Sequence, residues 1–347
     1  MRAVVAKRTG PPEVLRVADV APREPGPREI RIAVAACGVC FHDVVVRNGT
    51  FRRGVGMPVI LGHEVAGTVE KLGSEVRGLK RGDLVATTTY SHVCGDCRYC
   101  RGGHETSCPN RVFLGDAGLN GGYAELVCVD ADAVQKIPRG ISMEEASIVA
   151  CTVGTELNAV REIGRVRLGE RVLVTGAGGG RGLHGVQLCR LAGAFTIAVT
   201  TSEAKATRIR EAGADEVIVT GRGGDFSGEV RRLTNGNGVD AAIDNVGSPV
   251  FDSVRRSMAD GGRIVLVGQL TGDFISLNPA QLFLRNISIL SAKGVSRAQL
   301  ADALDLVARG RIKPIVENVC RLDDAAEAHR HVEAGLSSGR LVLSPMK

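Results

Sequence analysis

The sequence predicts an α/β protein with two domains, one rich in short β-strands and one built around a doubly wound parallel sheet. Its 347 residues suggest roughly two domains of about 100–200 residues each. Up to about residue 150, short apolar runs alternate with glycine and proline, which is typical of a compact β-rich domain. Between about residues 153 and 290, continuous apolar runs alternate with helical segments, as in a parallel sheet of βαβ units.

The expected elements follow one another without an internal repeat or a low-complexity linker. In the first part we expect strands within residues 29–38, 65–73, 83–90 and 123–129. In the second part we expect helices over 205–214 and 251–259, and buried strands within residues 171–176, 195–200, 216–221, 240–247, 263–269 and 287–292. An amphipathic helix over 296–312 and a strand over 339–345 follow them.

Composition and charge exclude several classes of function. The net charge of +6 comes from 44 basic and 38 acidic residues scattered along the chain, and aromatic residues make up only 3%. We therefore expect no nucleic-acid partner, whereas a small anionic ligand fits the modest positive charge. No apolar run approaches the ~18 residues of a membrane span, and the first apolar run is too short for a signal peptide. We expect a cytoplasmic protein without a membrane partner, whose thiols stay reduced.

Four cysteines are clustered in the segment CGDCRYCRGGHETSC. Gaps of two, two and seven residues separate Cys94, Cys97, Cys100 and Cys108. Each C-x-x-C turn places two sulfurs on one side of a metal ion, so four thiolates can surround a tetrahedral zinc. Four unpaired surface cysteines are rare at this density, an iron–sulfur cluster fits the spacing less well, and disulfides are rare in the cytoplasm. A closed site of this kind stabilises the fold and does not polarise a substrate.

A second set of metal-binding residue types is dispersed over the segments ACGVCFHD, LGHEVAG and VACTVGTELNA. A catalytic zinc needs three protein ligands and one open position, which Cys40, His63 and Cys151 would supply. Spacing alone leaves two alternatives open. These residues can be ordinary buried cysteines and a core histidine. Cys37 and Cys40 can also form a redox pair, although this C-x-x-C does not open the first helix of a βαβ unit.

A glycine run lies directly after an expected strand and before a helix, in RVLVTGAGGGRGLHGVQLC. Its GxxGxxG form is one residue longer than the usual dinucleotide fingerprint. Such glycines allow a tight turn and a close approach of the backbone, and the helix N-terminus receives a pyrophosphate. The strand–loop–helix context makes the motif specific. We expect the cofactor to contact the loop at Gly176, Gly178, Gly179, Gly180, Arg181 and Gly182.

The strand after the glycine loop ends in AVTTSEAK. An NAD site usually places an acidic residue there for the ribose hydroxyl, about 20 residues past the loop. This chain has Thr200, Thr201 and Ser202, followed by Lys205 and Arg208. Because hydroxyl groups and a cation suit a 2′-phosphate, the segment favours NADPH over NAD. Alternatively, the two cationic residues belong to a solvated helix face.

The chain resembles the zinc-dependent alcohol dehydrogenases of the medium-chain dehydrogenase/reductase family. The resemblance runs nearly from end to end, through GPREIRIAVAACGVC, GHEVAGTVEKLG, the four-cysteine segment, VLVTGAGGGRG and AAEAHRHVEAG. It implies that Cys40, His63 and Cys151 bind a catalytic zinc, and that Glu64 is a nearby ligand that can exchange. It further implies that Asp43 orients the zinc histidine. Together with the four-cysteine site, this makes two zinc ions per chain.

The resemblance also implies a cofactor site, a substrate and a reaction. Thr155 is expected to back the nicotinamide ring, Val267 to contact the cofactor, and Tyr90 with Phe51 to line the substrate pocket. Zinc would polarise the substrate oxygen while the nicotinamide exchanges hydride with the carbon. The implied reaction interconverts a small alcohol and an aldehyde or ketone, in a homodimer or homotetramer.

The implied fold is α/β, with a Rossmann doubly wound parallel sheet inserted in a GroES-like β-barrel catalytic domain. We expect the zinc-binding catalytic domain over residues 1–152 and the NAD(P)-binding domain over 153–291. The C-terminal part of the catalytic domain would then span residues 292–347, with the active site in the cleft between the two domains.

The chain departs from the family pattern at His42, where serine or threonine usually begins a proton relay, and at Val45, where some members have a further histidine. His42 either accepts the alcohol proton or only shapes the pocket, since an imidazole is suited to proton transfer near neutral pH.

Two alternative functions stay open. The segments CGVCFHD, ACTVGTELNA and TGAGGGRGLHGVQL are also similar to the acryloyl-coenzyme A reductase-like branch of the family, which delivers hydride to an activated double bond. Intact zinc ligands favour carbonyl chemistry over this alternative. A nucleotide-binding protein without turnover is a further alternative, disfavoured by the complete set of zinc ligands and by the lack of a basic patch.

Overall fold

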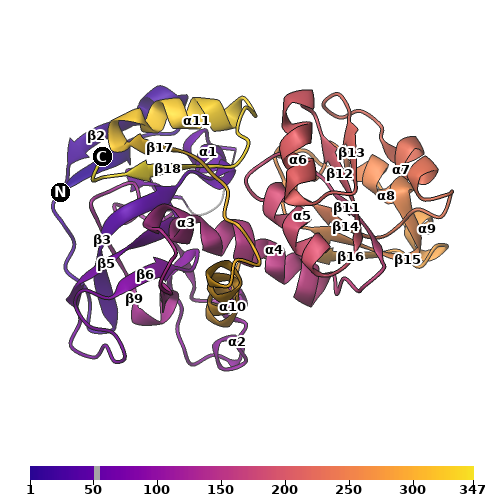
Figure 1. The fold of residues 1–347 in the computed structure, drawn as a ribbon. Helices are drawn as coiled ribbons and strands as arrows, with labels where there is room; N and C mark the ends of the chain where they lie inside the picture. Colours follow the sequence, from indigo (N-terminus) through magenta and orange to yellow (C-terminus); the bar gives the residue numbers. More distant parts are fainter. Residues whose placement is uncertain (51–54) are drawn as a thin grey trace. The chain divides into compact units, whose positions relative to one another are not determined.

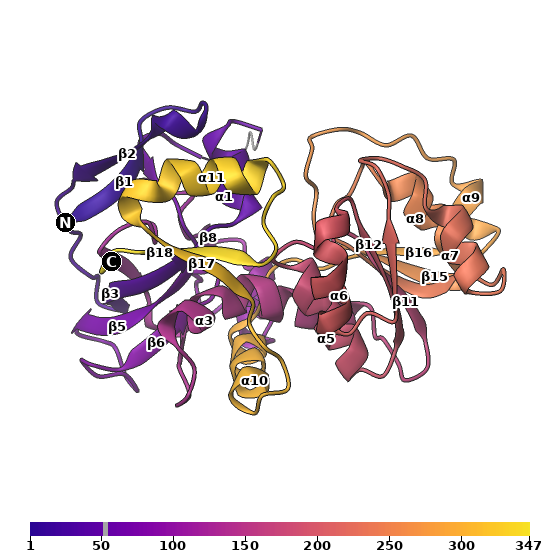
Figure 2. The same ribbon diagram turned by 45° about the horizontal axis from the view of Figure 1, so that its top comes forward.

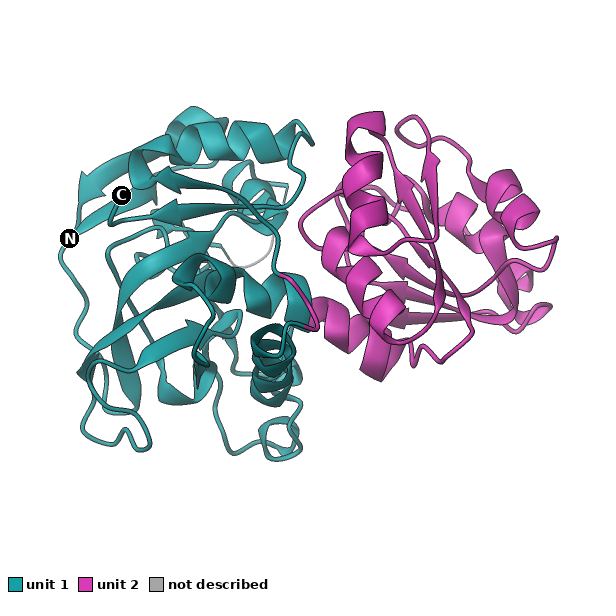
Figure 3. Cartoon of the chain, viewed as in Figure 1, with its two compact units in different colours: residues 1–154, 294–310, 314–347 teal, residues 155–293, 311–313 magenta. Residues whose placement is uncertain are grey.

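The computed structural model describes residues 1–50 and 55–347 and divides the chain into two compact units (Figure 3). Unit 1 comprises residues 1–154, 294–310 and 314–347, and unit 2 comprises residues 155–293 and 311–313. Unit 1 therefore combines both ends of the sequence, and unit 2 is inserted between them.

The main sheet of unit 1 is centred on strand β3 (Glu29–Gly38) (Figure 1). Its strand order is β10-β6-β5-β3-β18-β17, and β9 also pairs with β3. Strand β18 (Arg340–Ser344) pairs antiparallel with the end of β3, where Cys37 lies opposite Leu343. This pairing brings the last strand beside the segment that carries the first cysteines.

The remaining strands of unit 1 contribute to this sheet, to a sheet in the order β2-β1-β4, and to the hairpin of β7 and β8. Their bounds are β1 (Arg2–Ala6), β2 (Leu15–Asp19), β4 (Val59–Ile60), β5 (Glu64–Leu72), β6 (Leu84–Thr87), β7 (Tyr90–His92), β8 (Val112–Phe113), β9 (Leu126–Asp130), β10 (Val134–Lys136) and β17 (Val316–Arg321).

Several helices of unit 1 begin with a capping box, in which the N-cap side chain and the third helical side chain each accept a backbone hydrogen bond. Helices α3 (Met143–Ile148) and α10 (Arg297–Ala308) use serine caps, whereas Cys40 caps helix α1 (Phe41–Arg47). Helix α3 continues directly into a π-helical turn, Val149–Gly154. Helix α11 (Ala325–Glu333) lies along strands β17 and β18 (Figure 2), and helix α2 (Arg98–Arg101) lies in the four-cysteine segment.

Unit 2 is built around a parallel sheet in the order β13-β12-β11-β14-β15-β16. Its strands are β11 (Arg171–Val174), β12 (Phe195–Thr200), β13 (Glu216–Val219), β14 (Val239–Asp244), β15 (Met258–Leu266) and β16 (Ser288–Ser291). Its α-helices are α4 (Thr155–Leu157), α5 (Gly182–Leu191), α6 (Ala206–Ala212), α7 (Ser227–Leu233), α8 (Phe251–Ser257) and α9 (Ala280–Phe283). The strand order reverses between β11 and β14. Parallel sheets of this kind bind ligands at such a reversal, just outside the carboxyl ends of the strands.

The elements expected from the sequence are present, with three local differences, one of which is that the expected helix over residues 296–312 ends at Ala308. The run over residues 83–90 forms two strands, because β6 joins the main sheet while β7 pairs with β8. The expected helix over residues 251–259 ends at Ser257, and Met258 already belongs to β15. Within the described ranges, no helix combines the length and apolar character needed to cross a membrane.

Candidate metal centres and nucleotide-binding loop

Cys40 is held at the start of helix α1 by reciprocal hydrogen bonds. Its Sγ accepts from the backbone N–H of His42 at 3.5 Å, and the carboxylate of Asp43 accepts from the backbone N–H of Cys40 at 2.9 Å. A thiol therefore takes the place of the usual hydroxyl cap, and the helix N-terminus stabilises negative charge on it.

Four donor groups from separate segments meet at one buried position: Cys40, His63, Glu64 and Cys151. Their ligand atoms all lie within 4.8 Å of one another. The two Sγ atoms are 3.9 Å apart, and His63 Nε2 lies 3.8 Å from Glu64 Oε1. Tetrahedral zinc with bonds of about 2.0–2.3 Å places its ligand atoms roughly 3.3–3.8 Å apart, so the donor types fit zinc and the two spacings are close to those it requires.

The π-helical turn explains how Cys151 reaches this cluster. Turns of this kind occur mostly within α-helices and frequently at functional sites. The turn follows α3, which contacts strands β3 and β5 of the main sheet. His63 directly precedes β5 and Glu64 begins it, so the sheet and the helix fix the ligands from two sides.

Asp43 orients the imidazole of His63. His63 Nδ1 lies 3.1 Å from Asp43 Oδ1, which leaves Nε2 facing the other donor groups. Asp43 also accepts a hydrogen bond from the backbone N–H of Gly62 at 3.3 Å and from the hydroxyl of Tyr123 at 3.1 Å. An orienting carboxylate of this kind fixes the tautomer and the direction of a metal-binding histidine.

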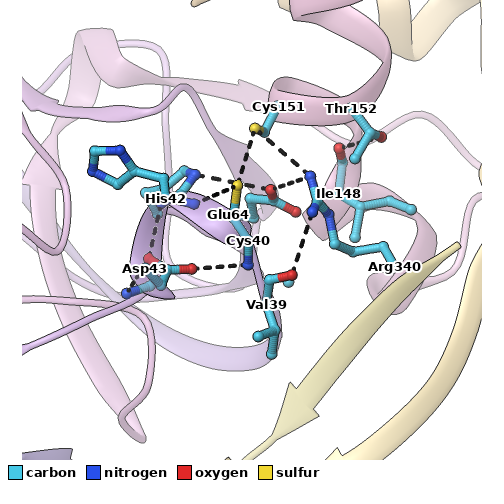
Figure 4. A network of polar contacts seen from close by, with 12 residues as sticks. Val39, Cys40, His42, Asp43, Glu64, Ile148, Cys151, Thr152 and Arg340 are labelled. Atoms are coloured by element: carbon cyan, nitrogen blue, oxygen red, sulfur yellow. Dashed lines mark hydrogen bonds and ion pairs between the residues drawn. The ribbon is translucent and has the colours of Figure 1, made fainter. Parts of the chain in front are cut away.

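A buried arginine, Arg340, joins the cluster from strand β18 (Figure 4). Its Nη2 forms an ion pair with Glu64 Oε1 at 2.9 Å and lies 3.8 Å from Cys151 Sγ, and its Nη1 donates to Val39 O at 3.3 Å. The sequence alone does not single out this residue, because β18 and β5 meet β3 only in the folded sheet. An arginine in the closing strand was the only available signal.

The electrostatics of the cluster suit a cation. The Cys151 thiol lowers the pKa of Cys40 well below its usual range, and Arg340 and His63 act in the same direction. Burial disfavours the imidazolium of His63, but Asp43 and Cys40 together raise its pKa well above the usual value. Burial also raises the pKa of Glu64 to about 7, although Arg340 opposes that shift. The protein groups alone thus favour additional positive charge at this position.

His42 lies beside this cluster, paired with a carboxylate that the sequence analysis did not identify. Its Nε2 is 2.9 Å from Asp116 Oδ1 and 3.1 Å from Oδ2. The His42 ring packs against Phe113 at a centroid distance of 4.5 Å, and Phe113 also contacts Tyr90 at 5.6 Å. Phe51, the other residue expected in the pocket, lies outside the described residues.

The four-cysteine segment forms a second compact group of thiols. Cys94, Cys97, Cys100 and Cys108 place their sulfur atoms within 4.8 Å of one another. Cys97 caps helix α2 and accepts from the backbone N–H of Cys100, and this hydrogen bond lowers the pKa of Cys97 to about 7. Burial raises the pKa of Cys100 to about 12, so zinc would have to displace its proton; the convergence of the four sulfur atoms is what fits a closed tetrahedral zinc site.

In unit 2 the glycine loop connects β11 to α5 as expected. Gly176 has a φ of +59°, and the backbone N–H of Gly179 donates to its carbonyl at 3.0 Å. A Cβ on Gly182 would lie 2.3 Å from that same carbonyl oxygen, so only glycine fits where helix α5 begins. The carbonyl of Gly180 accepts from His184 Nδ1 at 2.6 Å, which ties the loop to the first turn of α5.

Two of the predicted 2′-phosphate residues, Lys205 and Thr200, lie next to this loop. A Cβ on Gly178 would lie 2.8 Å from Lys205 Cδ and 3.2 Å from Thr200 Oγ1. Thr200 Oγ1 also accepts from the backbone N–H of Ser202 at 3.3 Å, and the neighbouring Thr201 is exposed.

The other expected cofactor residues fall at three places in unit 2. Arg181 Nη1 donates to the carbonyl of Val267, directly after β15, at 3.0 Å. Arg208 is half-buried in α6, and Thr155 is buried in α4, a helix that packs on α5.

Comparison with known proteins shows the family. Two family models match, "Alcohol dehydrogenase GroES-like domain" over residues 26–139 and "Zinc-binding dehydrogenase" over residues 180–309. The acryloyl-coenzyme A reductase of Sulfurisphaera tokodaii is 34% identical over 346 residues, covering 99% of this chain and 100% of that protein. The NAD-dependent alcohol dehydrogenase of Saccharolobus solfataricus is 34% identical over 354 residues with the same coverage. A crystal structure of an NAD-dependent alcohol dehydrogenase has a TM-score of 0.93 at 37% identity over 99% of both chains.

These matches and the geometry above define an oxidoreductase with a GroES-like domain and a Rossmann nucleotide-binding domain. The chain belongs to the zinc-type alcohol dehydrogenases of the medium-chain dehydrogenase/reductase family, as its motifs predicted. It is an enzyme that uses zinc and a nicotinamide cofactor on a small-molecule substrate.

Proposed function

We propose that this enzyme interconverts an alcohol and an aldehyde or ketone, with zinc held by Cys40, His63 and Cys151. The observation that carries the proposal is the meeting of two thiols, an imidazole and a carboxylate at one buried position. Zinc bound there supplies Lewis-acid polarisation of the substrate oxygen, and the nicotinamide supplies or accepts the hydride.

In this proposal Glu64 is the ligand that exchanges. Its carboxylate can bind either the metal or the guanidinium of Arg340, whose Nη2 lies 2.9 Å from Glu64 Oε1. When Glu64 pairs with the arginine, the two cysteines and the histidine leave the fourth position to the substrate oxygen. Asp43 keeps Nδ1 of His63 protonated, so that Nε2 can bind the metal.

We assign the transfer of the substrate proton to His42. The carboxylate of Asp116 holds His42 Nε2, which makes Nδ1 the unprotonated nitrogen of the neutral ring. A ring fixed in this way can accept a proton without first reorienting, and this supports a catalytic role over a merely steric one. Tyr90 and Phe113 would form the apolar wall beside it.

The test is the reduction of a saturated aldehyde with NADPH, together with the zinc content of the protein. Cys151→Ser should lose most of the activity and one zinc per chain, whereas Cys320→Ser, which changes a cysteine outside both thiol groups, should keep both. Wild-type activity and zinc content in the Cys151→Ser variant would contradict the proposal.

A second candidate function is the reduction of an activated carbon–carbon double bond. The match to an acryloyl-coenzyme A reductase over 99% of this chain favours it. Hydride adds to carbon in both reactions, but to the carbonyl carbon in the first and to the double bond in the second. The product formed from a substrate that offers both groups therefore separates the two functions.

We propose NADPH as the preferred cofactor. The support is the position of Lys205 and Thr200 beside Gly178, where the second strand of the sheet ends. A cation there attracts a 2′-phosphate, and hydroxyl groups can donate hydrogen bonds to it. The relative from Saccharolobus solfataricus is named NAD-dependent, so the ratio of kcat/KM for NADPH and NADH is the deciding measurement.

We further propose a structural zinc at the four-cysteine segment and a homodimer or homotetramer that acts in the cytoplasm. Strand β16 stands at an edge of its sheet and is largely exposed, and Phe274, Phe283 and Leu284 in the same part of the chain are exposed as well. Exposed apolar groups beside an unpaired strand edge support association with a second chain. The zinc content would test the structural zinc, and sedimentation analysis would test the oligomeric state.

A further inference from the structure

A chain of buried polar groups runs from the ligand histidine of the proposed zinc site to helix α11. Tyr123 Oη lies 3.1 Å from Asp43 Oδ2 and 3.2 Å from His329 Nε2. Asp43 in turn lies 3.1 Å from Nδ1 of His63. Tyr123 and His329 have no exposed surface, and Asp43 retains only 2%. Bulk solvent therefore does not reach these groups.

The position of Tyr123 is fixed by its backbone and by its ring. Its N–H donates to Leu61 O at 2.9 Å, and its carbonyl accepts from the N–H of Val4 at 2.8 Å. Its ring lies over Gly62, where a Cβ would approach ring atom Cδ1 to 2.5 Å. Gly62 also has a φ of +98°, so the residue before His63 must be glycine both for its conformation and for this packing.

The hydrogen bonds of this chain determine where its protons lie. Asp43 already accepts from the N–H of Cys40, the N–H of Gly62 and Nδ1 of His63, so its carboxylate has no proton to donate to Tyr123. The single hydroxyl proton of Tyr123 therefore points to Asp43. His329 must then donate from Nε2 to the oxygen of Tyr123.

The surroundings of His329 agree with this arrangement. Its Nδ1 has no hydrogen-bond partner among the described residues, which costs less for an unprotonated nitrogen than for a buried N–H. Burial lowers the pKa of His329 to about 4, so the ring is neutral near pH 7. The neutral tautomer of His329 with its proton on Nε2 is therefore consistent with every hydrogen bond from His329 through Tyr123 and Asp43 to His63.

We propose that Tyr123 and His329 are positioning residues that hold Asp43, and through it the zinc ligand His63, in the geometry for metal binding. The inference rests on the zinc site proposed above and extends it to two residues that do not touch the metal. The hydroxyl of Tyr123 and the N–H of Cys40 together hold Oδ2, which leaves Oδ1 for His63. Without that hydroxyl, Oδ2 has a single donor and the carboxylate can rotate away from the imidazole.

The test measures zinc retention rather than turnover. Tyr123→Phe keeps the ring over Gly62 and removes only the hydroxyl. Loss of a group that orients a metal ligand typically lowers metal affinity by about 10–100-fold. Tyr123→Phe should therefore release the buried zinc to a chelator about 10-fold faster, with an unchanged rate for the zinc of the four-cysteine segment.

His329 provides two graded variants and a matched control. His329→Leu removes the donor to Tyr123 and should speed zinc release less than Tyr123→Phe does. His329→Gln can place an amide N–H near the former Nε2 and should restore the wild-type rate. His331→Gln changes the other histidine of α11, whose ring contacts Glu317, and should have no effect.

Several results would overturn the inference. A release rate within twofold of wild type in Tyr123→Phe would do so. Equal effects of His329→Leu and His329→Gln would show that the ring only fills space. If the zinc-free Tyr123→Phe protein melts at a lower temperature, and this loss of stability accounts for the faster zinc release, Tyr123 has a structural role instead. If the wild type holds no zinc at Cys40, His63 and Cys151, the proposed function itself fails, which is a separate outcome.

Discussion

Replacing Arg340 by methionine should strongly destabilise unit 1, because it leaves the carboxyl group of Glu64 buried without its counter-charge. Arg340 retains 6% exposed surface and Glu64 none, and their ion pair measures 2.9 Å. At an effective dielectric constant of about 20, two unit charges at this distance attract by about 6 kcal/mol. Desolvation offsets much of that attraction, and removal of one partner from a buried pair typically costs about 3–5 kcal/mol.

The assay is urea unfolding of the zinc-free protein at about pH 8, where Glu64 with its pKa of about 7 is ionised, followed by tyrosine fluorescence. The chain has no tryptophan, and Tyr90, Tyr99 and Tyr123 all belong to unit 1, so the signal reports the unfolding of that unit. Arg340→Met should lower the free energy of unfolding by about 3–5 kcal/mol. The double variant Arg340→Met/Glu64→Gln contains no unpaired charge. Its free energy of unfolding should therefore fall by less than the sum of the decreases in the two single variants. Additive losses would refute the claim that the two side chains stabilise each other.

Three further predictions concern the cofactor, the proton and the four-cysteine segment. Lys205→Ala should raise the KM for NADPH about 10-fold, as expected for the loss of one charge-assisted hydrogen bond, and should leave the KM for NADH unchanged. An equal rise in both KM values would show that Lys205 does not bind the 2′-phosphate. His42→Ala should lower kcat by about 100-fold and alter its pH profile, and an unchanged rate and profile would remove His42 from the mechanism. Cys97→Ser should reduce the zinc content, measured by elemental analysis, by one ion per chain, and should lower the melting temperature, measured by calorimetry. A full zinc content in this variant would contradict the second metal site.

Acid should also destabilise the zinc-free protein through His329. Because its pKa in the folded protein is about 4 and that of a free histidine is near 6.5, the unfolded chain binds the proton first as the pH falls. The associated stability is present above pH ~6.5 and is lost between about pH 6.5 and 4. This stability amounts to about 3.5 kcal/mol, at about 1.4 kcal/mol for each pKa unit of the difference. The difference between wild type and His329→Gln in urea unfolding across that range should show this loss, and a flat difference would contradict it.

The sequence predicted those parts of the site whose geometry is local. In the four-cysteine segment, all the proposed ligands come from 15 consecutive residues, so their spacing already constrained them. The glycine loop is equally local, since one strand, one turn and one helix create it. Cys40, His63 and Cys151 are different, because 111 residues separate the two cysteines and only the fold brings them together. For these ligands the family resemblance, rather than spacing, provided the prediction.

The partners that complete the site could not be predicted from the sequence. Arg340 reaches Glu64 because β18 pairs with β3 across some 300 residues of sequence, and Asp116 reaches His42 from the segment after β8. No local pattern distinguishes these residues from other charged residues. The helix expected to end at residue 259 was misplaced for a similar reason, since pairing with β14 draws Met258 into β15.

The product formed from a 2-enal and NADPH by the zinc-loaded enzyme tests the central claim most directly. Such a substrate offers the same hydride both a carbonyl group and a conjugated double bond. Carbonyl chemistry at the buried cluster predicts the allylic alcohol as product, and predicts that Cys151→Ser abolishes its formation. A saturated aldehyde, formed equally well by the Cys151→Ser variant, would contradict the account and assign the enzyme to double-bond reduction.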